Sequence, residues 1–215
     1  MNILYVYAHP HLFSLNATLK QIALDFLKLK SNVQCSDLYA DKFKAIADWH
    51  DFDLAETEMN SQYFLAQQTA YQKNKLSADI MVEIDKVAWA DHIIFQFPLW
   101  WFSMPAILKG WFDRILVKGF AYDVGKVFND GLLSGKSASL VVSTQSPESA
   151  YQPNGIHSAT IDVFLHHIHH TLRFVGMQIY APFITYAAFN LDTTRKEKMV
   201  QDYLAYLQNL AGEIA

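Results

Sequence analysis

Residues 95–114 read F-Q-F-P-L-W-W-F-S-M-P-A-I-L-K-G-W-F-D-R, and this stretch decides how the rest of the chain is interpreted. The apolar run at 92–97 predicts a buried strand that breaks at Pro98. The connection after it carries five large apolar side chains, Leu99, Trp100, Trp101, Phe102 and Met104. A loop rarely carries so much apolar surface unless it covers something. The stretch therefore predicts a strand, an aromatic loop and a helix, with Ser103 as the N-cap and Pro105 in the first turn.

Apolar runs elsewhere in the chain predict further strands, which would form one sheet with the strand at 92–97. Four further strands are predicted, at 2–8, 33–38, 137–143 and 178–188. Helical patterns alternate with these runs, which favours an α/β fold with a doubly wound parallel sheet. The simplest order for five such strands is the flavodoxin-like 2-1-3-4-5, with helices on both faces. No Pro/Gly/Ser linker divides the chain, so we interpret residues 1–215 as a single domain.

The composition argues against several classes of protein. Seventeen basic and 21 acidic residues give a net charge of -4, which argues against nucleic acid or an acidic membrane surface as the main partner. Cys35 is the only cysteine, so no internal disulfide can form. The sequence opens on a predicted strand without a signal-type leader, and no apolar run approaches the roughly 20 residues of a spanning helix. We therefore expect a cytoplasmic protein.

In the predicted strand order, the loops after strands one, three and four meet at one crevice, where open parallel sheets bind their ligands. The first of these loops offers Ser14, Asn16 and Thr18 just where a helix exposes its first unpaired N–H groups. This placement favours an anion site, although the same residues could serve only to cap the helix. The usual dinucleotide pattern G-x-G-x-x-G is absent from the chain.

The loop after the fourth predicted strand carries Tyr151 and His157. An anion site, an aromatic loop and a polar loop at one crevice together suit a flavin nucleotide, which has a phosphate, a flat ring and a polar edge. An alternative is that Tyr151 only packs and His157 only caps a helix. The aromatic residues at 99–102 could likewise be core or subunit-contact residues, because such residues dominate cores and interfaces.

Several motifs carry a resemblance to a known family. Residues 95–114, G-F-A-Y at 119–122, Y-A-H-P at 7–10 and Y-x-x-x-G-I-H at 151–157 resemble the NAD(P)H:quinone oxidoreductase (DT-diaphorase) family of flavodoxin-like enzymes. The resemblance runs over nearly the whole length. It implies a homodimer that holds FAD without a covalent bond and passes hydride from NADH or NADPH to a quinone by a ping-pong route.

The resemblance also implies roles for individual residues. The cofactor phosphates would be held by His9, Ser14, Leu15, Asn16 and Thr18. The isoalloxazine ring would lie along Pro98, Leu99, Trp100, Trp101 and Phe102. Its other polar edge would face Ser143, Thr144, Gln145 and Ser146, and Arg195 would lie near the cofactor after a one-residue gap. The catalytic pair, which would stabilise negative charge near N1 and O2 when hydride reaches N5, would be Tyr151 and His157.

The chain departs from the family pattern in three places. Gln145 and Ser146 stand in a loop that usually reads T-T-G-G, Trp100 replaces a common glutamine, and Val124 replaces a tyrosine that often lines the substrate pocket. The same fold family also includes regulatory flavoproteins, so an ancillary subunit of a potassium efflux system remains an alternative. An FMN-dependent azo or nitro reductase, or an FMN-only electron carrier, is another.

Four histidines at 166, 167, 169 and 170 invite a metal hypothesis, because the first and last lie one helical turn apart. The helical pattern places them opposite the apolar stripe. No carboxylate or cysteine is positioned by the sequence to complete a site, so we expect no metal.

Overall fold

A computed structural model describes residues 1–59, 62–189 and 191–214. The strands are β1 (Asn2–Tyr7), β2 (Asn32–Asp37), β3 (His92–Pro98), β4 (Ser137–Ser143), β5 (Gln178–Ile179) and β6 (Phe183–Thr185). The helices are α1 (Leu15–Leu27), α2 (Glu56–Met59), α3 (Tyr63–Gln72), α4 (Ala78–Trp89), α5 (Ala106–Ile115), α6 (Ile161–Phe174) and α7 (Thr193–Glu213). Short 3-10 turns lie at Trp49–Asp51, Phe128–Asp130 and Glu148–Ala150.

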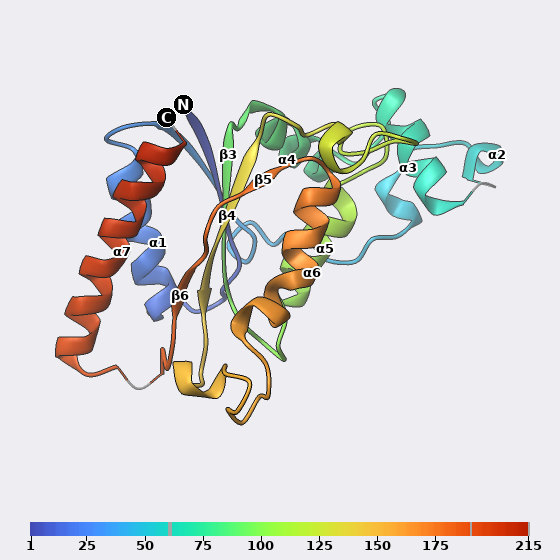
Figure 1. Cartoon of the computed structure of the whole chain (residues 1–215). Helices are drawn as coiled ribbons and strands as arrows, with labels where there is room; N and C mark the ends of the chain where they lie inside the picture. Colours follow the sequence, from blue (N-terminus) through green and yellow to red (C-terminus); the bar gives the residue numbers. More distant parts are fainter. Residues whose placement is uncertain (60–61, 190, 215) are drawn as a thin grey trace.

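The sheet is parallel with the order β2-β1-β3-β4-β5, and β6 also pairs with β4. This order confirms the prediction. Helices α1 and α7 cover one face of the sheet, and α4, α5 and α6 cover the other (Figure 1). The central strands are buried on both faces, which explains why they read as continuous apolar runs instead of alternating ones.

The fifth predicted strand is wrong in its extent, because the structure divides residues 178–188 into β5 and β6. Ala138 pairs with Ile179, whereas Val141 pairs with Phe183, so the outer strand holds one extra residue between the two pairings. Pro182 lies in that gap and has no N–H to donate to the ladder. A bulge at the edge of the sheet therefore replaces a continuous strand.

The predicted N-cap of the central helix is also wrong. Helix α5 begins at Ala106, with Pro105 at the N-cap position and no side-chain capping bond. Trp101 and Phe102 adopt left-handed backbone conformations, with φ of 51° and 62°, and the Ser103 N–H donates to the Trp100 carbonyl at 3.0 Å. Ser103 is thus the last residue of a tight turn that precedes the helix.

Residues 56–72 contain α2 and α3, and residues 60–61 between them lie outside the described residues. These helices belong to the long segment between β2 and β3. None of the helices within the described ranges is long and apolar enough to span a membrane.

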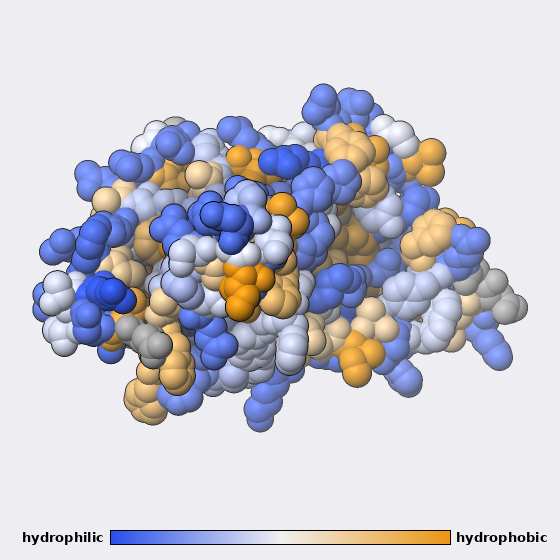
Figure 2. Space-filling model, turned by 60° about the horizontal axis from the view of Figure 1, so that its bottom comes forward, coloured by the Kyte–Doolittle hydropathy of each residue, from blue (hydrophilic) through white to orange (hydrophobic). Residues whose placement is uncertain are grey.

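The carboxyl ends of the strands point to the edge of the molecule that is lowest in Figure 1, away from both termini. The loops that follow β1, β3 and β4 all reach this edge. Figure 2 turns the edge toward the viewer and shows hydrophobic residues in separate patches with hydrophilic surface between them. The three loops with predicted ligand-binding residues therefore lie together, as the strand order requires.

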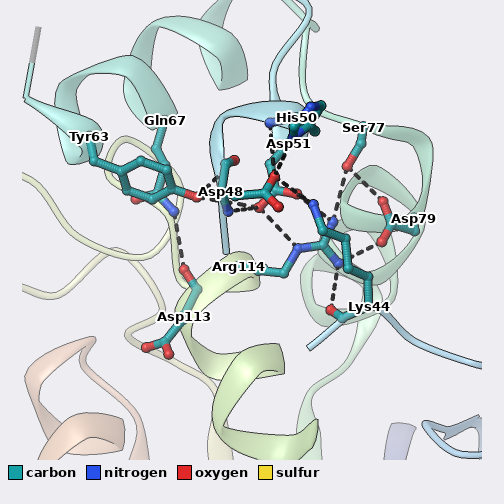
Figure 3. Close-up of polar contacts among 10 residues, drawn as sticks. All are labelled: Lys44, Asp48, His50, Asp51, Tyr63, Gln67, Ser77, Asp79, Asp113 and Arg114. Carbon is teal, nitrogen blue, oxygen red and sulfur yellow. Dashed lines mark hydrogen bonds and ion pairs between the residues drawn. The ribbon is translucent and has the colours of Figure 1, made fainter. Parts of the chain in front are cut away.

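A buried ion network ties the long segment between β2 and β3 to α5. Figure 3 shows Arg114 pointing between Asp51 and Asp79, with Lys44 beside them. Nη2 and Nε of Arg114 lie 2.9 and 3.1 Å from the Asp51 carboxylate, and Nη1 lies 2.6 Å from Asp79 Oδ2. Both Arg114 and Asp51 are only 1% exposed. Because α5 follows the aromatic loop directly, this network anchors the helix on which that loop depends.

Candidate functional site

Two adjoining hollows lie at the carboxyl edge of the sheet. The larger, of about 510 Å³, is lined by His9, His11, Phe13, Ser14, Leu15, Asn16, Pro98, Leu99, Trp100, Ser143, Thr144, Gln145, Ala188 and Phe189. The smaller, of about 420 Å³, is lined by Leu99, Trp100, Trp101, Phe102, Gln145, Ser146, Tyr151 and His157. Leu99, Trp100 and Gln145 line both hollows, so the two form one continuous trough.

The larger hollow contains the start of α1. Ser14 is the N-cap, and its Oγ accepts the Ala17 N–H at 3.1 Å and donates to the His11 carbonyl at 2.8 Å. Leu15 and Asn16, whose N–H groups precede the first intrahelical bond, also line this hollow. Capping and anion binding are therefore compatible here, because the cap leaves the first two N–H groups of the helix available.

His9 also lines the larger hollow, and its hydrogen bonds fix its tautomer. Its Nδ1 accepts the His11 N–H at 3.1 Å and lies 3.0 Å from Ser14 Oγ. Burial lowers the pKa of His9, and its neighbour His11 shifts it less, so the ring is neutral at neutral pH. Since Nδ1 accepts, the proton of the neutral ring must lie on Nε2. His9 thus offers an N–H group without carrying a charge.

A buried chain of polar side chains supports the floor of the larger hollow. Tyr5 Oη lies 3.0 Å from Tyr203 Oη and donates to Gln96 Oε1 at 2.6 Å. Gln96 Nε2 then donates to the Asn16 carbonyl at 2.7 Å, and Asn16 Nδ2 donates to Ser143 Oγ at 2.8 Å. Because Ser143 Oγ accepts from Asn16, its own proton is free to bond a ligand. Sequence reasoning overlooked Gln96, although it is the one polar residue in the apolar run 93–97.

The aromatic loop lines both hollows where they meet. The Leu99 N–H donates to the Ser143 carbonyl at 2.8 Å, which fixes the loop to the end of β4. Beyond it, Trp100 packs against His9 with ring centroids 6.1 Å apart. Trp101 is 95% exposed at the outer rim. Trp101 and Phe102 have left-handed backbone conformations, which are unusual for residues with bulky side chains. Backbone strain of this kind is concentrated at functional sites.

Tyr151 and His157 lie together in the smaller hollow. Their ring centroids are 4.7 Å apart, and Phe102 meets the His157 ring edge-on at 5.1 Å. His157 Nε2 lies 3.0 Å from Ser146 Oγ. A phenol and an imidazole, both able to donate hydrogen bonds, thus stand beside an aromatic wall.

Most of the predicted site residues line the trough, but two do not. Thr18 is exposed on the first turn of α1, where its hydroxyl donates to the Ser14 carbonyl at 3.3 Å. Arg195 lies at the start of α7, with its Nε 3.8 Å from Asp192 Oδ2, and lines a separate hollow beside Pro147. The roles of all the predicted site residues stay predictions.

Three aromatic residues of the larger hollow were not predicted. His11, Phe13 and Phe189 line its outer end, and Phe13 and Phe189 are 93% and 80% exposed. A sequence signal existed for the first two, because they flank the predicted anion loop. Phe189 follows the last strand, so only the fold brings it to the trough.

The four histidines of α6 do not share one solvent face. His169 is only 9% exposed, which contradicts its predicted place opposite the apolar stripe. His166 and His170 stack with centroids 5.7 Å apart, and His167 Nε2 lies 2.9 Å from Ser103 Oγ. Among the described residues, no group of three or more histidine, cysteine or acidic side chains is placed to hold a metal ion.

Comparisons with known proteins place this architecture in a family. The sequence profile of the family described as a flavodoxin-like fold matches residues 1–210. Human ribosyldihydronicotinamide dehydrogenase (quinone) is 39% identical over 98% of this chain and 92% of its own length. Guinea-pig (Cavia porcellus) NAD(P)H dehydrogenase (quinone) 1 is 37% identical over 98% of this chain and 77% of its own.

A solved structure agrees with the sequence relatives. A Klebsiella pneumoniae protein assigned as a quinone reductase superposes with a TM-score of 0.92, at 36% identity, over 98% of this chain and 85% of its own. The sequence matches extend over nearly the full chain, well beyond the aromatic loop. This chain belongs to the NAD(P)H:quinone oxidoreductase family of flavodoxin-like, flavin-dependent proteins.

Proposed function

We propose that the chain is an FAD-dependent NAD(P)H:quinone oxidoreductase. It would take hydride from NADH or NADPH and pass it, in a second half-reaction, to a quinone or a similar flat aromatic acceptor. The observation that carries this proposal is the continuous trough, which has hydrogen-bond donors for an anion at one end and an aromatic wall with Tyr151 and His157 at the other.

The residues of the trough suit a flavin nucleotide. Ser143 and the start of α1 offer donors to phosphate oxygens, as helix N-termini commonly do. Leu99 and Trp100 offer apolar surface to a flat ring where the hollows meet. Family membership independently implies a flavin. The lining of the trough indicates which residues would bind it.

The outer end of the larger hollow favours FAD over FMN. Phe13 and Phe189 line the same hollow as the start of α1, and both are highly exposed. Large exposed apolar side chains next to a pocket commonly mark a binding surface. FMN ends at its phosphate and would leave these rings uncovered, whereas the adenine of FAD would extend onto them.

The side chains of the smaller hollow would control charge and protons. A bound flavin would supply the two-electron redox chemistry that side chains cannot perform. Tyr151 and His157 would donate hydrogen bonds toward the negative charge that hydride transfer creates, and removing one such donor commonly costs about 3 kcal/mol of barrier stabilisation. His157 could also pass a proton to a quinone oxygen. Trp101 and Phe102 leave an open aromatic rim suited to flat substrates that bind one after the other.

We also propose a homodimer. Trp101 and Val124 are 95% and 87% exposed, and a third hollow of about 470 Å³ lies between α5 and α6 with Met104, Phe112 and Phe174 in its lining. Exposed apolar surface of this kind favours a protein contact. A second copy of the chain would cover it and would narrow the open rim of the trough. The cytoplasmic location and the single domain stay predictions.

The identity of the cofactor can be tested by reconstitution. Protein stripped of nucleotide is titrated with FAD and FMN while the quenching of flavin fluorescence is followed. We expect FAD to bind at least about tenfold more tightly than FMN, a difference of about 1.4 kcal/mol. Phe13→Ala and Phe189→Ala should lower the affinity for FAD but leave that for FMN unchanged. Equal affinities for both nucleotides would remove the case for FAD.

A further inference from the structure

The structure gives His157 a hydrogen-bond partner that the proposed chemistry has not yet used. Ser146 Oγ lies 3.0 Å from His157 Nε2, within ordinary hydrogen-bond distance, and both side chains are partly buried. Ser146 stands in the loop after β4, where the family pattern reads glycine instead. A glycine has no hydroxyl, so this contact belongs to this chain's own sequence.

The backbone of Ser146 is fixed from two sides. Its carbonyl accepts the Thr144 hydroxyl at 2.8 Å and the Ala187 N–H at 3.0 Å. Pro147 follows and restricts Ser146 to extended conformations. The Ser146 hydroxyl therefore projects from a rigid backbone. A rigid backbone is needed if this hydroxyl is to hold the His157 side chain in place accurately.

The backbone of His157 is fixed as well. Its N–H donates to the Ala150 carbonyl at 3.1 Å. Gly155 packs so closely against the preceding turn that a Cβ there would fall 2.4 Å from the Ser149 carbonyl oxygen. Tyr151 and Phe102 confine the imidazole between them, with centroids 4.7 and 5.1 Å away. The imidazole can still rotate about its bond to Cβ, and the hydrogen bond to Ser146 restrains this rotation.

We propose that Ser146 is a positioning residue that holds the His157 ring in one orientation through the reaction. The proposal rests on the proposed function. A serine hydroxyl can donate to a neutral imidazole nitrogen and can accept from a protonated one. The bond to Nε2 therefore survives when His157 gains or loses a proton, so the ring need not turn between the two half-reactions. An alanine or a glycine at this position could not provide this restraint.

The test uses Ser146→Ala, with Ser146→Thr to restore a hydroxyl and Ser149→Ala as a matched control. Ser149 is an exposed serine of the same loop. The first readout is the rate of quinone reduction by the flavin-loaded enzyme. We expect a loss of about tenfold in kcat for Ser146→Ala, which is part of the roughly 10²–10⁴-fold that a positioned acid–base group contributes. Ser146→Thr should recover most of it, and Ser149→Ala should match the wild type.

The second readout distinguishes positioning from a general disturbance of the loop. Long-range ¹H–¹⁵N spectra of the full chain report the two ring nitrogens of His157, and the signals lost in His157→Gln assign them. We expect Ser146→Ala to move the Nε2 signal and Ser146→Thr to keep it near its wild-type position. Ring signals that are the same in wild type and Ser146→Ala would overturn the proposal.

A third measurement examines coupling between the two residues. In a His157→Gln background, Ser146→Ala should cost much less than the tenfold it costs in the wild type, because there is no imidazole left to orient. An equal loss in both backgrounds would mean that Ser146 acts elsewhere, and would overturn the proposal. A protein that binds no flavin would overturn the proposed function instead, and the ring spectra would still decide whether Ser146 holds His157.

Discussion

Tyr151 and His157 are close enough to act on the same charge, since their ring centroids are 4.7 Å apart. Replacing both, as Tyr151→Phe with His157→Gln, keeps the shape of the smaller hollow but removes both proposed donors. We expect the reduction of bound flavin by NADH or NADPH to slow by about a hundredfold or more, because the loss of even one such donor commonly costs about 3 kcal/mol of barrier stabilisation. Stopped-flow absorbance measures this step directly.

A matched control for this pair is Tyr186→Phe. The Tyr186 ring lies 5.7 Å from that of Tyr151 but does not line the smaller hollow. The control should reduce flavin at the wild-type rate, and the double variant should still bind the cofactor with an affinity within about threefold of the wild type. Unchanged reduction in the double variant would remove the catalytic role from both residues.

At the scale of single residues, the sequence could predict the place of those on the loops that follow β1, β3 and β4. Ser14, Trp100 and Tyr151 lie on loops whose place is set by the strand order, so the topology alone brings them to one edge. Arg195 was placed only by resemblance, and α7 carries it away from the trough. Phe189 was missed because the bulge and the chain path after β6 decide where it lies.

Among the elements, α5 supports the aromatic loop and depends on a close approach of the backbone. A Cβ on Gly110 would fall 1.9 Å from the Ala45 carbonyl oxygen, so nothing larger than glycine fits there. Gly110→Ala should therefore destabilise the protein by about 2–3 kcal/mol, the usual cost of overpacking. Urea unfolding at neutral pH measures this change.

Gly212→Ala provides the control for that substitution. Gly212 also lies in a helix, but a Cβ there would meet no atom within 4 Å. The change should leave stability equal or raise it by less than about 1 kcal/mol, since alanine is the better helix former. Equal unfolding midpoints for the two variants would contradict the assigned contact with Ala45.

The ion network at the other end of α5 predicts a dependence on pH. Burial alone would raise the pKa values of Asp51 and Asp79, but hydrogen bonds and the charge of Arg114 hold both below the ordinary 3.8. Carboxyls of this kind stabilise the fold above their unfolded pKa, and the contribution is lost as the pH falls through the lower folded value. Stability should therefore decline on acidification below about pH 4.

Arg114→Met tests this account, with Lys109→Met as the control on the same helix. Removing Arg114 leaves the buried Asp51 without its main partner and should cost about 3–5 kcal/mol at neutral pH. That difference should shrink as the pH falls and the carboxyls become protonated. Lys109 pairs with Asp113 at the surface, so its loss should cost less than about 1 kcal/mol. A cost for Arg114→Met that does not change with pH would contradict the role of the carboxylates.

Element types and order could be predicted from periodicity, but two boundaries could not. The break between β5 and β6 depends on the pairing register with β4, which no local pattern reports. Serine is a residue type favoured at N-caps. Ser103 is instead the last residue of a turn, because Trp101 and Phe102 adopt left-handed conformations before it. In both places, tertiary contacts outweighed the secondary-structure preference of the local sequence.

For the whole molecule, the strand order was predictable because parallel strands joined by helices permit few topologies. The oligomeric state was harder to predict from the sequence, because exposed apolar residues can bind either a ligand or a second chain. We predict that the protein sediments at micromolar concentration with twice the 24.6 kDa mass of one chain. Val124→Asp, at an exposed apolar position, should shift it toward the monomer. A monomeric wild type would contradict the homodimer.

The visible absorption spectrum of the purified protein, followed through one redox cycle, tests the central claim most directly. Protein loaded with FAD is treated without oxygen, first with NADH or NADPH and then with a quinone such as menadione. We expect oxidised-flavin bands that bleach with the first addition and return with the second. A protein that acquires no flavin bands with either FAD or FMN, or whose reduced bands persist after the quinone is added, would contradict this claim.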